Sequence, residues 1–199
     1  MESQLTILLP VAAVWLAAGV VADGLPRLRN THMLHRRTGW LLVLALTGVA
    51  LTTAVLGAGL LSAGTAPVDQ AAAGLTLVAG PALVATVCSV RRIRRLRAGA
   101  GAFASAPATP APHGLRAAAA HPLVGLPLQA TALATVPAVI AAVGTDLGAD
   151  PSVTGPAITV GALAVVAIGV RHALRHSRFA EQVQPHTPRS ARATDPLHI

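Results

Sequence analysis

Long apolar runs alternate with short polar segments along this chain. Five runs approach the length of about 20 residues that a helix needs to cross ~30 Å of hydrocarbon. None of them carries a charged side chain, which is costly at the centre of a bilayer. The pattern predicts an all-α integral membrane protein, a bundle of five transmembrane helices. The predicted spans are Leu5–Ala22, Gly39–Ser62, Ala71–Val90, Leu123–Val143 and Ser152–Val170.

The arginines predict the orientation of these spans. All 15 basic residues are arginine, and they fall only in the first connection, the third connection and the C-terminal tail. The N-terminus and the other two connections carry only acidic charges. Because basic residues collect on the cytoplasmic side, we expect the N-terminus outside and the C-terminus inside. The expected topology anchors are Arg27, Arg29, Arg36, Arg37, Arg91, Arg92, Arg94, Arg95, Arg97, Arg171, Arg175 and Arg178.

The predicted organisation is one membrane domain over residues 1–178 and a disordered cytoplasmic tail over 179–199. A flexible cytoplasmic linker is expected at 91–120, where the Gly/Ala/Pro stretch "AGAGAFASAPATPAPHG" lies. The first span has no basic segment before it, so we expect a retained helix and not a signal peptide. Spans 2–3 and 4–5 form two similar hairpins, which leaves an internal duplication open. The arginine-only, alanine-rich composition indicates a bacterial protein of the cytoplasmic (inner) membrane.

Composition narrows the functional classes. Only 11% of residues are charged, against about 25% in soluble domains. The net charge of +8 lies in blocks beside apolar runs, and aromatic residues make up 2%. Nucleic-acid binding is therefore not expected, because its stacking surfaces need aromatic side chains. The single Cys88 excludes an internal disulfide.

The predicted spans contain no carboxylate, histidine or lysine, and the chain lacks nucleotide-binding and hydrolase motifs. A transporter or a membrane enzyme therefore has no support in the sequence. We expect a non-catalytic membrane module whose basic cytoplasmic face engages anionic lipid or a partner protein.

Five histidines lie near the inner ends of the spans: His32, His35, His121, His172 and His176. The simplest interpretation places them at the headgroup level as amphipathic side chains. A metal site from His32, His35, His172 and His176 is an alternative, although neighbouring arginines would repel a cation. The third alternative is a haem held axially by His35 and His121, with Gly39 and Gly125 one turn away leaving room for the macrocycle.

The entry "LHRRTGW" into the second span carries a family resemblance. The segment His32–Ser62 resembles small predicted membrane proteins that are related to b-type cytochromes and ferric-reductase-like domains. The resemblance implies a four-helix haem-binding core, which spans 2 to 5 could supply, and passage of electrons within the membrane. Under this hypothesis the cofactor is haem b; otherwise we expect none.

Overall fold

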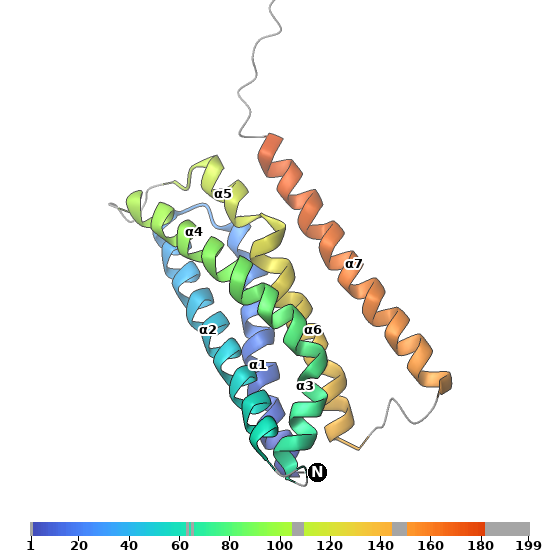
Figure 1. Ribbon diagram of the computed structural model, residues 1–199. Coiled ribbons are helices and arrows are strands. Elements are labelled where there is room, and N and C mark those ends of the chain that lie inside the picture. The colour runs from blue at the N-terminus through green and yellow to red at the C-terminus, as the bar shows by residue number, and fades with distance from the viewer. Residues whose placement is uncertain (1, 63, 65, 105–109, 145–150, 182–199) are drawn as a thin grey trace, which may run out of the picture.

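The computed structural model describes residues 2–62, 64, 66–104, 110–144 and 151–181, with side chains from residue 155 onward in the last segment. Within these residues the chain is all-helical, apart from one isolated backbone bridge between Asn30 and Pro110. Figure 1 shows the arrangement of the helices. They are α1 (Glu2–Gly24), the 3₁₀ turn η1 (Leu25–Arg27), α2 (Thr31–Leu61), α3 (Pro67–Val84), the π-helical turn η2 (Ala85–Ser89), α4 (Val90–Ala102), α5 (His113–Ala119), α6 (Pro122–Ala142) and α7 (Pro151–Glu181).

In the described part of the chain, five helical stretches are long and apolar enough to cross a membrane, which confirms the expectation of five such helices. Each contains nearly all of one predicted span and extends beyond it at one end or both. The stretches are Glu2–Arg27, Thr31–Leu61, Pro67–Ala102, His113–Ala142 and Gly155–Glu181.

Several helices extend beyond the predicted spans on the arginine-rich side. α2 begins at Thr31 because the side-chain oxygen of Asn30 accepts hydrogen bonds from the backbone N–H groups of His32 (2.8 Å) and Met33 (3.4 Å). α7 continues to Glu181, past the expected start of the tail at residue 179. The remainder of the predicted tail, 182–199, lies outside the described residues.

The segment expected to be a linker, 91–120, differs most from its prediction. α4 continues the α3 helix to Ala102, and α5 forms over His113–Ala119. In α4 the buried residues Ile93, Leu96 and Ala100 recur every three or four positions and pack toward α2. This apolar stripe stabilises α4, which the sequence analysis did not predict because the segment is rich in arginine. Residues 105–109 of the predicted linker lie outside the described residues.

Helices α1, α2, α3 and α6 form a four-helix bundle. Trp15 of α1 is completely buried, and its indole N–H donates to the hydroxyl oxygen of Thr52 on α2 (3.0 Å). A Cβ atom placed on Gly48 would lie 2.8 Å from the Trp15 ring, so glycine is required for this approach. The four-helix core of the described residues therefore includes the first helix, α1, and leaves α7 outside it.

A proline in α6 leaves a backbone carbonyl that a neighbouring helix satisfies. Pro127 has no N–H, so the carbonyl of Leu123 lacks its usual partner four residues later. The hydroxyl of Ser89 in η2 donates to that carbonyl at 2.8 Å, and Ser89 is fully buried. Such compensation is how membrane helices tolerate internal proline. It also fixes the junction of α3 and α4 against the start of α6.

α7 lies outside the four-helix bundle. It contacts α5 and α6 mainly through its C-terminal part and departs from the bundle toward its N-terminal end, as Figure 1 shows. Only 6% of the most apolar part of α7 is buried, against 22–44% in the other four long helical stretches. The attachment of α7 therefore depends on contacts near residues 171–179.

Candidate functional site: the basic end

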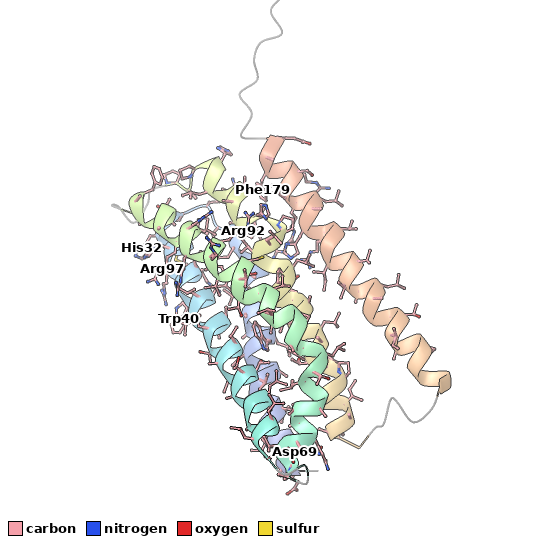
Figure 2. All side chains as sticks on the ribbon, viewed as in Figure 1. His32, Trp40, Asp69, Arg92, Arg97 and Phe179 are labelled. Atoms are coloured by element: carbon pink, nitrogen blue, oxygen red, sulfur yellow. The ribbon has the colours of Figure 1, made fainter. Side chains whose placement is uncertain are left out.

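One end of the bundle carries the positive charge of the described chain. The C-terminal end of α1, the N-terminal end of α2, α4, α5 and the C-terminal part of α7 meet there; we call it the basic end. In Figure 2, His32, Arg92, Arg97 and Phe179 lie at this end, and Asp69 lies at the opposite one. All the predicted topology anchors belong to these segments or to the connection between α1 and α2, so the fold brings together arginines that are far apart in sequence.

Asp23, at the C-terminal end of α1, collects three of these arginines. Its carboxylate lies 3.3 Å from Arg27, 2.9 Å from Arg171 and 2.5 Å from Arg175. The Asp23 side chain is 19% exposed, whereas those of Arg27 and Arg171 are 66% and 50% exposed. One carboxylate cannot neutralise three guanidinium groups, so the cluster keeps a positive charge. These ion pairs also join α7 to α1.

A partly buried chain of hydrogen bonds reinforces this junction. The ring of His172 on α7 is 3% exposed, and its Nε2 donates to the amide oxygen of Gln129 at 3.0 Å. The amide nitrogen of Gln129 in turn donates to the carbonyl of Gly19 at 3.2 Å. A Cβ atom on Gly125 would overlap the His172 ring. Gly125 therefore makes room for His172, and three helices meet at this point.

Two further histidines and one cation–π contact complete the junction. The Nδ1 of His121 accepts from the backbone N–H of Leu123 (3.1 Å) and so caps α6. His176 donates from Nδ1 to the carbonyl of Ala117 (3.2 Å), and its ring centroid lies 4.9 Å from that of His121. The guanidinium of Arg116 lies 4.9 Å from the centroid of the Phe179 ring. These contacts join α5 and α6 to the last turns of α7.

His35 belongs to a different contact. Its Nδ1 donates to the carbonyl of Arg97 on α4 at 3.1 Å. The guanidinium of Arg97 covers Gly39, where a Cβ atom would lie 3.6 Å from its central carbon. The predicted pair is therefore divided: His35 joins α2 to α4, and His121 caps α6 beside α7.

This arrangement does not fit a haem between His35 and His121. The room expected at Gly39 holds the Arg97 side chain, and the room at Gly125 holds the His172 ring. A macrocycle at either glycine would have to displace these groups. For the alternative of a metal site, the described residues contain no group of three His, Cys, Asp or Glu side chains placed to hold a metal ion.

Many arginines at the basic end have no acidic partner among the described residues, where every ion pair involves Asp23. Six of them are exposed and project from α2 and α4. They are Arg36, Arg37, Arg91, Arg94, Arg95 and Arg97. Because the apolar side of α4 is already packed against α2, its arginines are presented outward. The basic end thus offers several guanidinium groups to an external anion.

The sequence alone does not predict the contacts of two residues at the basic end, Asp23 and Gln129. Asp23 looks like an isolated carboxylate near the first arginines, and its contacts with Arg171 and Arg175 span about three quarters of the chain. Gln129 looks like one more polar residue within a span. The one indication in the sequence is that each residue type is unusual at its position: Asp23 is a carboxylate close to arginines, and Gln129 is an amide within an apolar run.

No protein-family model, curated protein or solved structure matches this chain. The class of the protein therefore rests on its own fold. Its described residues form five helices that are long and apolar enough to span a bilayer.

Proposed function

We propose that this chain is a non-catalytic module of the bacterial cytoplasmic membrane whose basic end binds anionic lipid headgroups. In this proposal the N-terminus lies outside and the basic end faces the cytoplasm, as the positive-inside rule requires. The observation that carries the proposal is the set of outward-facing arginines without acidic partners among the described residues.

Helix length supports the placement of these arginines at the headgroups. The continuous stretch Pro67–Ala102 has 36 residues, or about 54 Å at 1.5 Å per residue. Hydrocarbon accounts for ~30 Å of that length. The other ~24 Å, which includes α4, therefore reaches into and beyond the headgroup layer. Each basic residue near an anionic surface contributes about 1 kcal/mol of attraction.

A groove beside α2 supports the same placement. It has a volume of about 340 Å³ and is lined by Val21, Met33, Trp40 and Leu44 together with Arg36 and Arg37. Trp40 is 57% exposed. Tryptophan with neighbouring arginine is typical of the interface between hydrocarbon and headgroups.

Binding of individual lipids to the full-length protein tests the proposal. The protein is purified in a neutral detergent and mixed with phosphatidylglycerol or phosphatidylcholine, and native mass spectrometry counts the lipids retained. We expect a preference for phosphatidylglycerol that falls when Arg36, Arg37, Arg91 and Arg95 are all changed to Gln. Changing the same four residues to Lys keeps the charge and should keep the preference.

Equal retention of the two lipids by the unmodified protein would contradict the proposal. A cytoplasmic protein with an acidic surface is the other ligand that these arginines could serve. Equal lipid retention, together with salt-sensitive binding of such a protein, would assign the basic end to that partner instead.

The haem alternative has its own test. A reduced-minus-oxidised absorption spectrum of protein expressed with haem precursor should be featureless, because Arg97 and His172 fill the space at Gly39 and Gly125. An α-band that disappears in His35→Ala or His121→Ala would instead establish a haem protein.

A further inference from the structure

An open groove of about 670 Å³ runs along one side of α7. Its lining changes character along the helix, from apolar residues in the membrane-spanning part to arginines at the basic end. The lining residues are Leu163, Val166, Ala167, Val170, Arg171, Leu174, Arg175 and Arg178. From the first to the last of them the helix rises about 22 Å. That length matches one leaflet of a bilayer, headgroup included, at half of about 40–45 Å.

We propose that this groove is a binding site for one anionic phospholipid. An acyl chain lies along Leu163, Ala167 and Val170, and the phosphate accepts hydrogen bonds from Arg171 and Arg178. The inference rests on the proposed function and deepens it, since it assigns one lipid molecule to a defined site. The remaining arginines of the basic end attract anionic headgroups without such a site.

The arginines of the groove differ in how free they are to bind a phosphate. Arg175 is 22% exposed and lies 2.5 Å from Asp23, so it is committed to that carboxylate. Arg171 is half-exposed and reaches Asp23 through one terminal nitrogen, which leaves further N–H groups on its guanidinium. Arg178 is exposed and has no ion pair within the described part of the chain. Arg171 and Arg178 are therefore the phosphate ligands.

The positive charge of the groove favours a lipid over a second copy of the chain as its occupant. Two copies in the same membrane orientation that packed through this groove would bring two clusters of arginines together, and like charges at close range repel. A phospholipid has the matching division, with apolar chains and an anionic phosphate. The departure of α7 from the bundle also leaves its span exposed to the hydrocarbon, where lipid chains are the available filling (Figure 1).

The test measures phosphatidylglycerol retention by full-length variants, with native mass spectrometry in neutral detergent. Arg178→Gln removes one phosphate ligand, and Arg94→Gln removes the same charge from α4. Ala167→Phe fills the apolar part of the groove, and Ala162→Phe adds the same ring at an exposed position of α7 outside it. All four positions are exposed, so the variants should fold, and their melting temperatures verify this.

We expect Arg178→Gln to weaken the tightest phosphatidylglycerol about fivefold, the effect of one basic residue at an anionic surface. Arg94→Gln should weaken it less. Ala167→Phe should abolish the tightest binding event, and Ala162→Phe should leave it unchanged.

Three results would overturn the site. If Arg94→Gln and Arg178→Gln weaken retention equally and Ala167→Phe has no effect, headgroups bind diffusely; the groove is then wrong and the proposed function stands. A dimer that Ala167→Phe dissociates would show that a second copy occupies the groove. If the unmodified protein does not prefer phosphatidylglycerol over phosphatidylcholine, both the site and the proposed function fail.

Discussion

At the scale of single residues, several glycines of this protein serve as spaces for particular side chains. Gly48 admits the ring of Trp15, Gly125 admits the ring of His172, and Gly39 lies beneath the guanidinium of Arg97. Other glycines, such as Gly57, have nothing near the position of a Cβ atom. Substitutions by alanine should therefore have very different effects at chemically identical positions.

Gly48→Ala should destabilise the bundle by about 1–3 kcal/mol, because its methyl group would force Trp15 or α2 to move. Gly57→Ala, in the same helix, is the matched control and should be neutral or slightly stabilising. The free energy of unfolding in mixed micelles, followed by circular dichroism, measures both. Equal effects at the two positions would show that Trp15 does not limit the approach of α1 and α2.

At the scale of elements, the proline in α6 and the π-helical turn η2 between α3 and α4 are linked by one hydrogen bond. Pro127 deprives the Leu123 carbonyl of its helical partner, and Ser89 in η2 supplies a replacement. The hydrogen bond from Ser89 compensates for the one that Pro127 removes. Their energies should consequently be coupled.

Ser89→Ala should destabilise the protein by about 0.6–1.7 kcal/mol, the range for hydrogen bonds between membrane helices. In a Pro127→Ala background the restored N–H can bond to Leu123, so the same substitution should cost much less. A double-mutant cycle of unfolding free energies measures the coupling. Strict additivity of the two substitutions would disprove the compensation.

The attachment of α7 is a second feature at this scale. Its span is exposed, and its last turns are held by contacts with Asp23, Gln129, Ala117 and the ring of His121. A helix with few packed side chains and a local set of polar contacts should detach when those contacts are disturbed, while the four-helix bundle stays folded.

Gly125→Ala should loosen α7 because its methyl group overlaps the His172 ring. Amide hydrogens of the last turns of α7 should then exchange faster in hydrogen–deuterium exchange, and those of α1 and α2 should not change. Gly161→Ala on α7, where nothing lies within 4 Å of the added atom, is the control. Unchanged exchange in Gly125→Ala would show that His172 does not hold the helix.

At the scale of the whole molecule, the separation of charge is the dominant feature. Arginines from the first connection, the third connection and the end of α7 converge on one end, whereas Asp69 lies at the other (Figure 2). An even number of spans would place the connections differently and mix the two sets of charges. The proposed orientation is therefore tied to the number of helices.

Fusion reporters test that orientation. A fluorescent protein that matures only in the cytoplasm should be active at the C-terminus, and alkaline phosphatase, which folds only outside the cytoplasm, should be inactive there. The same two reporters placed at residue 64, between α2 and α3, should give the reverse result. Active phosphatase at the C-terminus would invert the topology and remove the basic end from the cytoplasm.

The sequence predicts the long helices well because bilayer thickness demands apolar runs of a fixed length, and nothing else in the chain resembles them. It predicts helix ends poorly: the Asn30 cap and the Ile93–Leu96–Ala100 stripe lie among arginines that suggest a loop. The site is harder still. The contact of His172 with Gln129 joins residues 43 positions apart, and nothing local in the sequence specifies it.

The two tryptophans are intrinsic fluorescence probes of two different regions of the protein. There is no tyrosine, so almost all near-ultraviolet fluorescence comes from Trp15, which is fully enclosed, and Trp40, which is 57% exposed on α2. With Trp40→Phe the remaining emission reports when the interior opens. With Trp15→Phe it reports how deep α2 sits, because brominated acyl chains quench an indole only at their own depth. A single chain thus carries separate reporters for its folding and for its place in the bilayer.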